Sequence, residues 1–301
     1  MFDPTDLYRL AEETPELTDP VLVYHFDGFV DAGSTGRLAL GHLLAELEHS
    51  VVATFDVDRL IDYRSRRPTM TFDTDRWVDY EAPELALYHA RDLTGTPFLL
   101  LTGPEPDREW ELFVAAVGRL VERLGVSRLV TVHGIPMAVP HTRPLGVTAH
   151  ASRPELINSQ VSAFGRVQVP GSVAALLEFR LGGQGRDALG YAVHVPHYLS
   201  QAEYPQAAVT ALEAITKGTG LVFPMDSLHD AADRTTSEIE EQIRASSELS
   251  SAIQGLEQQY DAFAGGQERQ NLMAEATPMP TGDELAAQFE AFLAERDDRD
   301  S

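Results

Sequence analysis

The 301-residue chain is 43% hydrophobic and carries a formal net charge of −24, so it can bury a sizeable core and is not a disordered chain. The negative balance argues against a nucleic-acid partner or an acidic membrane surface, because both need a basic face. The chain has no cysteine, which excludes disulfides, thiolate metal sites and a cysteine nucleophile.

The first residues lack the basic and apolar regions of a signal peptide,. Apolar runs such as residues 98–101 are too short to span a bilayer,. We therefore expect a cytoplasmic protein.

Strand and helix patterns alternate along most of the chain. An apolar run at 21–26 predicts a buried strand, and a glycine-rich turn and a leucine-rich helix follow it,. Further strands are predicted at 51–55, 85–89, 98–102, 128–132, 147–151, 166–169 and 189–195, and helices at 108–124, 171–181 and 205–217. The polar stretch 60–80 is interpreted as an irregular segment that contains edge strands. This order predicts an α/β fold, a three-layer mixed sheet with helices on both faces.

Local residue signals predict three helix starts. Ser172 is expected to cap the helix at 171–181,. Asp107 is expected to cap the helix at 108–124,. Pro205 is expected to start the helix at 205–217,. A long loop is expected from 133 to 144.

The composition changes near residue 223, which divides the chain into an α/β core domain at 1–223 and an acidic helical extension at 224–301. Residues 226–301 carry 18 Asp or Glu against 5 Arg. An apolar stripe at helical spacing runs through Leu249, Ile253, Leu256, Tyr260 and Phe263, and Ile239 and Ile243 extend it upstream,. Such a stripe packs on the core or on another chain. A last helix is expected to begin at Asp283.

The turn after the first strand is the first candidate site. It contains Asp27, Asp31, Gly33 and Ser34. It matches neither nucleotide-binding glycine motif, and its two carboxylates would repel phosphate. One interpretation is a structural turn in which Asp31 and Ser34 are caps. The other is a ligand or partner site at the carboxyl end of the sheet.

The loop at 134–144 is the second candidate site. Its three prolines make it stiff, and it carries Gly134, His141, Thr142 and Arg143. Arg143 is suited to clamp a carboxylate or a phosphate, and His141 to transfer a proton near neutral pH. The alternative is that Arg143 pairs with an internal Asp and the loop organises an interface.

Histidines gather near the ends of the later strands. His194 and His197 have the spacing His-x-x-His. On a strand followed by a proline, this spacing does not bring the two imidazole rings to one point. We therefore predict no metal site. His197 and Tyr198 join the candidate residues for a ligand or partner.

Three segments together resemble the proteasome assembly chaperone 2 family, in its actinobacterial form with an acidic helical extension. They are residues 27–33, the Pro-His-Thr-Arg-Pro sequence at 140–144, and Val-Pro-His-Tyr at 195–198. The resemblance covers roughly 15–220. It implies a purine nucleoside phosphorylase-like fold with no catalytic residue and no cofactor. Relatives bind proteasome α-subunits, some through a hydrophobic-Tyr-any-residue tail. This chain ends Asp-Asp-Arg-Asp-Ser and lacks that signal.

Two hypotheses about function follow. The first is a non-catalytic, assembly-chaperone-like protein that interacts with another protein, with the proteasome as one candidate, or with itself as a homo-oligomer. The alternative is a small-molecule-binding protein or an enzyme that uses the phosphorylase-like cleft.

Overall fold

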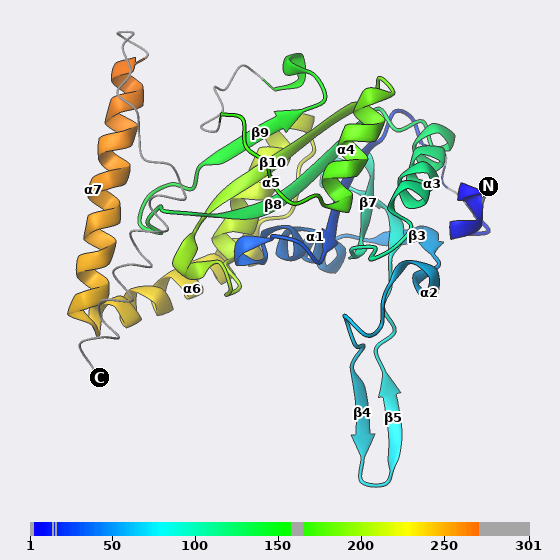
Figure 1. Ribbon diagram of the computed structural model, residues 1–301, viewed down its shortest axis with the longest axis horizontal. Coiled ribbons are helices and arrows are strands. Elements are labelled where there is room, and N and C mark those ends of the chain that lie inside the picture. Colours follow the sequence, from blue (N-terminus) through cyan, green and yellow to red (C-terminus); the bar gives the residue numbers. More distant parts are fainter. Residues whose placement is uncertain (1–2, 14, 16, 158–164, 271–301) are drawn as a thin grey trace.

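The computed structural model describes residues 3–13, 15, 17–157 and 165–270. Within them, an eight-stranded sheet runs through the centre of the molecule (Figure 1). In sheet order its strands are β1 (Tyr8–Leu10), β3 (His49–Phe55), β6 (Ala86–Arg91), β7 (Pro97–Pro104), β2 (Val21–Asp27), β8 (Arg128–Met137), β10 (Asp187–Pro196) and β9 (Val147–Ala151).

The sheet is mixed, as predicted. β7, β2, β8 and β10 are parallel to their neighbours in the centre. The pairs β1–β3, β3–β6, β6–β7 and β10–β9 are antiparallel toward the two edges. The central strands are nearly continuous apolar runs because helices cover both of their faces.

Helices form a layer on each face of the sheet. The described helices of four or more residues are η1 (Pro4–Leu7), α1 (Thr35–Glu46), α2 (Val57–Leu60), α3 (Trp110–Arg123), α4 (Val173–Gly183), α5 (Pro205–Thr219), α6 (Asp226–Arg244) and α7 (Ser247–Gln270). Three-residue 3₁₀ turns lie at η2 (Ala32–Ser34), η3 (Pro154–Leu156) and η4 (His197–Leu199).

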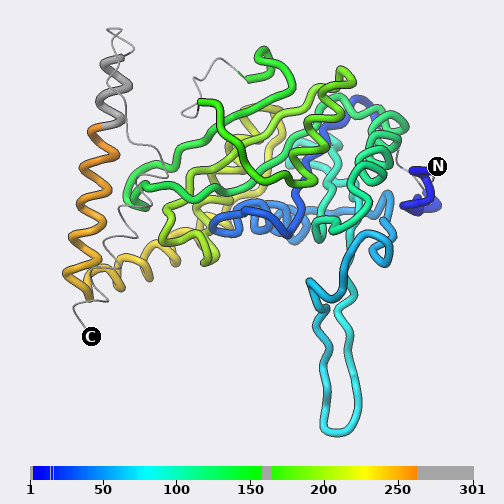
Figure 2. Tube along the Cα trace, viewed as in Figure 1, coloured from blue at the N-terminus to red at the C-terminus, as the bar shows by residue number. Residues whose placement is uncertain are grey.

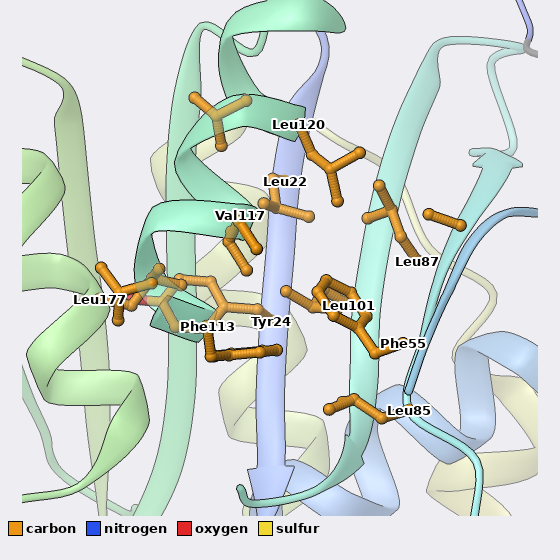
Figure 3. Close-up of a cluster of buried hydrophobic side chains, with 14 of the residues drawn as sticks. Leu22, Tyr24, Phe55, Leu85, Leu87, Leu101, Phe113, Val117, Leu120 and Leu177 are labelled. Carbon is orange, nitrogen blue, oxygen red and sulfur yellow. The ribbon is translucent and has the colours of Figure 1, made fainter. Parts of the chain in front are cut away.

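One core lies between the sheet and helices α3 and α4. Phe113 of α3 packs edge-on against Phe26 of β2, with ring centroids 5.5 Å apart. Figure 3 shows Leu22, Tyr24 and neighbouring side chains interlocked beneath α3. Burial of these large side chains supplies the main driving force for folding.

A second core lies on the opposite face, against α1, α5 and the first turns of α6. Leu40, Leu43 and Leu212 are fully buried there. Leu228 and Ala232 of α6 belong to the same cluster. The start of the acidic extension is therefore anchored to the core by apolar contacts, while the domain boundary at 223 stays a prediction.

A hairpin of β4 (Met70–Asp73) and β5 (Arg76–Tyr80) projects from the body (Figures 1 and 2). It forms a separate two-stranded sheet, and the residues of both strands are exposed. Edge strands were expected in this stretch, but their projection away from the core was not.

One predicted strand end and one predicted strand were wrong, and long-range pairing explains the first. β8 continues to Met137 instead of ending at 132, because β10 pairs with it as far as Pro196. Pro136 is tolerated because β2 pairs with β8 only through Thr131,. The stretch 166–169 is not a strand. β9 already occupies that edge of the sheet.

The expected cap at Asp107 was also wrong. The helix begins at Trp110, and its N-cap is Glu109. The Asp107 carboxylate instead accepts hydrogen bonds from the N–H of Asp62 at 2.7 Å and the guanidinium of Arg66 at 2.7 Å. Ser172 caps α4 and Pro205 starts α5, as predicted.

The acidic extension begins as two helices. α6 packs on α5, and α7 stands at one side of the core beside the loop between β8 and β9 (Figures 1 and 2). Within the described residues no helix is long and apolar enough to cross a membrane. The side chain of Phe263 and the helix predicted from Asp283 lie outside the described parts of the chain.

Candidate functional site

The carboxylate of Asp31 holds the first glycine-rich turn in place. It accepts hydrogen bonds from the backbone N–H groups of Gly36 at 2.9 Å, Arg37 at 3.2 Å and Gly134 at 2.9 Å. Gly36 and Arg37 lie in the first turn of α1, and Gly134 lies on β8. Asp31 therefore caps the helix, as one interpretation predicted, and also ties the turn to the second candidate segment.

Gly33 and Ser34 have structural roles in the same turn. Gly33 has a φ of 67°. Its N–H donates to the carbonyl of Ser200 at 3.0 Å, and its carbonyl accepts from the N–H of Tyr204 at 2.9 Å. Its conformation favours glycine. The Ser34 hydroxyl accepts from Arg37 at 3.1 Å, and it makes no side-chain cap bond to α1.

His25 is a buried titratable group beside this turn. Its Nδ1 lies 3.0 Å from the carbonyl of Val132. Its Nε2 lies 3.4 Å from a carboxylate oxygen of Asp27 and 3.4 Å from one of Asp31. Burial alone would lower the pKa of His25, but the bond to Asp27 and the two negative charges outweigh burial and raise it,. No motif pointed to His25, because this residue lies inside an apolar strand pattern.

Arg66 is a second residue that the sequence did not point to. Its guanidinium donates to the carbonyl oxygens of Asp27 and Glu105 and to the carboxylate of Asp107, each at 2.7 Å. It thereby braces the ends of β2 and β7 from the base of the projecting hairpin. Glu105 is buried, and burial raises its pKa although Val173 donates to it.

The second loop carries a His–Tyr contact. The hydroxyl of Tyr198 on η4 accepts from the backbone N–H of His141 at 2.9 Å, and it lies 2.8 Å from Nδ1 of the same residue. Burial lowers the pKa of His141 despite the charges of Glu240 and Glu257 nearby, and burial raises that of Tyr198. Two candidate residues 57 positions apart therefore meet.

The other polar residues of the loop contact the acidic extension. Arg143 donates through Nε and Nη2 to the two carboxylate oxygens of Asp261, each at 2.8 Å. Its Nη1 lies 3.3 Å from Glu257, and Thr142 donates to the same carboxylate at 2.5 Å. The Tyr260 hydroxyl donates to the carbonyl of Pro144 at 3.0 Å. These contacts match the alternative in which Arg143 pairs with an internal Asp.

A groove of about 330 Å³ lies between this loop and the helices α6 and α7. It has both polar and apolar walls. Its lining includes His141, Thr142, Ile243, Arg244, Ile253 and Glu257. α7 thus covers the loop without filling the space beside it.

The candidate residues therefore divide into two neighbouring clusters. Asp27, Asp31, Gly33, Ser34 and Gly134 surround the first turn. His141, Thr142, Arg143 and Tyr198 face the extension. The segment 197–204 touches both clusters, because Tyr198 contacts His141 while Ser200 and Tyr204 bond to Gly33.

His194 is held in a side-chain contact, and His197 lies against the backbone. His194 Nε2 lies 2.8 Å from the Thr148 hydroxyl. Burial lowers the pKa of His197, against a hydrogen bond with the backbone of Met137. Among the described residues no group of three or more His, Asp or Glu is placed to hold a metal ion.

Comparison with known proteins finds a matching family and several similar solved structures. The PAC2 family pattern matches residues 25–243. A Mycobacterium tuberculosis protein of unknown function is 47% identical, with a TM-score of 0.85 over 88% of this chain and 92% of its own. A Corynebacterium glutamicum protein of unknown function is 39% identical, with a TM-score of 0.81 over 85% and 97%.

A third similar structure is that of an assembly-chaperone homologue. A Mycobacterium tuberculosis proteasome-assembly chaperone homologue is 25% identical, with a TM-score of 0.70 over 77% of this chain and 99% of its own. None of the curated proteins matches the chain.

Proposed function

This chain belongs to the PAC2 family, and from that premise we propose that it is a non-catalytic protein-interaction or assembly factor that works as a homo-oligomer in the cytoplasm. The likeness to a proteasome-assembly chaperone homologue supports an assembly role. It makes a proteasome component the first client to test.

The exposed β4–β5 hairpin carries the proposal. Its apolar side chains are largely open to solvent: Met70 48%, Phe72 55%, Trp77 62%, Val78 50% and Tyr80 48%. Large exposed apolar patches mark protein interaction sites in soluble proteins. Trp and Tyr are among the residues that contribute most at interfaces.

The hairpin is also poorly supported within one subunit. A lone two-stranded hairpin is marginally stable in water. Besides the pairing of its two strands, it is supported by the edge-on contact of Phe72 and Trp77, with ring centroids 5.0 Å apart. Burial of this face on a second copy would stabilise the arm and remove the apolar surface from water.

The mass of the protein in solution tests self-association. We expect sedimentation equilibrium to give an oligomer for the wild type and a monomer for Phe72→Ser/Trp77→Ser. Asp75→Ser, in the exposed turn of the same hairpin, is the matched control and should keep the oligomer. A monomeric wild type, or an unchanged mass in the double variant, would overturn the proposal.

Capture of a client tests the assembly role. Immobilised full-length chain is incubated with purified proteasome α-subunits, and binding is measured against the Phe72→Ser/Trp77→Ser variant. Retention of α-subunits above a bare-matrix control supports the assignment. No retention at micromolar concentrations would remove the proteasome as the client.

The groove beside His141 supports one second candidate, a small-molecule-binding function. Its volume of about 330 Å³ and its polar lining suit a small ligand,. Nucleosides and phosphate are the first probes, and binding should raise the melting temperature. If no probe shifts it, this candidate is abandoned.

A further inference from the structure

The loop at 141–144 forms hydrogen bonds with one face of α7. Glu257, Tyr260 and Asp261 lie three and four positions apart, so they share a face. Arg143 and Thr142 bind the two carboxylates, and the Pro144 carbonyl accepts from the tyrosine. The loop therefore binds a short pattern of side chains on an acidic helix. The pattern is a carboxylate, followed one turn later by a tyrosine and a second carboxylate.

The attachment of α7 at this place is mostly polar and partly solvated. The side chains of Arg143, Glu257 and Asp261 are 31%, 25% and 54% exposed. Along the apolar stripe Leu256 is buried, whereas Leu249 is 49% exposed. Exposed ion pairs contribute little and are screened by salt. α7 is therefore suited to leave the loop reversibly.

The fit between α7 and the loop is also incomplete. Ile253 and Ile243 line the groove that remains beside His141 and Thr142. A helix with a larger apolar side chain at the place of Ile253 would fill this space and gain contacts that α7 lacks. A partner can therefore outcompete the chain's own helix.

We propose that the loop at 140–144 is a docking site for an acidic helix of a partner protein, and that α7 occupies this site as an intramolecular competitor. The charge complementarity of Arg143 with two carboxylates and the unfilled groove are the two features that select such a partner. The inference rests on the proposed interaction function and names the chemistry of the partner.

Binding of a free helix peptide to the full-length chain tests the proposal. The probe is a fluorescein-labelled peptide of residues 247–262, and its anisotropy is measured. The wild type should bind it weakly. Glu257→Gln/Asp261→Asn in the full chain removes the charges by which α7 binds the loop. This variant should bind the peptide about tenfold more tightly, because a site that α7 occupies about nine-tenths of the time binds a competing peptide with a tenfold lower apparent affinity.

Three comparisons make the test specific. Arg143→Ala added to the opened chain should abolish binding. A peptide with Ile253→Phe should bind more tightly than the parent peptide. Glu238→Gln/Glu241→Gln removes two exposed charges from α6 and should leave the wild-type affinity unchanged.

Release of α7 is followed independently. The chain lacks cysteine, so Gln258→Cys and Arg153→Cys accept a pair of spin labels at these positions alone. The opened chain should show a broadened distance distribution. An unchanged distribution, no gain in peptide affinity on opening, or binding that survives Arg143→Ala would each overturn the inference. The oligomeric mass, which depends on the hairpin, is expected to stay constant, so this failure is distinct from failure of the proposed function.

Discussion

Arg143 and Asp261, 118 positions apart in the sequence, form two parallel hydrogen bonds of 2.8 Å each. The pair joins the stiff loop after β8 to α7. Its two-armed geometry fixes the orientation of the helix more firmly than a single contact would. The carboxylate raises the pKa of Arg143, and the guanidinium lowers that of Asp261.

Arg143→Ala should loosen α7 without unfolding the core. Hydrogen exchange of α7 amides should become faster, because local opening requires fewer contacts to break. The melting temperature should change by about 2 °C or less. Arg180→Ala breaks a comparable exposed pair with Glu111 and should leave exchange in α7 unchanged. Equal exchange in all three proteins would contradict this role.

Asp31→Ala should destabilise the fold by about 2 kcal/mol, because three backbone N–H groups lose their acceptor,. Urea unfolding gives the measurement. Asp3→Ala is the comparison, since its carboxylate accepts from Thr5 at an exposed turn, and it should cost much less. Equal losses would show that Asp31 does not brace the turn.

Gly134→Ala should destabilise by about 2–4 kcal/mol. An added Cβ would overlap the carbonyl oxygen of Ala32 and crowd the Thr35 hydroxyl. Gly41→Ala is the matched control, because nothing lies within 4 Å of its added Cβ. In the middle of α1 that change should stabilise by about 0.5–1 kcal/mol. Thermal unfolding of the two variants should therefore shift in opposite directions.

His133 should make the fold sensitive to acid. Burial, and then the charge of His150, lower its pKa to about 4. The unfolded chain takes up this proton near pH 6.5 while the folded chain does not, so stability is lost as the pH falls through that window. Between pH 7 and pH 5 the wild type should lose about 2 kcal/mol more than His133→Gln. Parallel stability profiles would show that His133 is not the group.

Local patterns were enough to predict much of the core. The apolar run at 21–26 and the leucine spacing after Gly36 correspond to β2 and α1. The predictions were wrong where a contact with a residue distant in the sequence determines the local structure. Met137 is in a strand because β10 runs beside it, and Asp107 does not cap α3 because Arg66 and Asp62 bind its carboxylate.

By itself the sequence determined the alternation of strands and helices, the mixed three-layer sheet, the family and the acidity of the extension. These properties follow from periodicity, composition and short motifs, which are local. The tertiary structure decided that Asp31 bridges two loops, that His141 meets Tyr198, and that Arg143 holds Asp261 on α7. Such contacts depend on the relative placement of elements up to 118 positions apart, which no local spacing encodes.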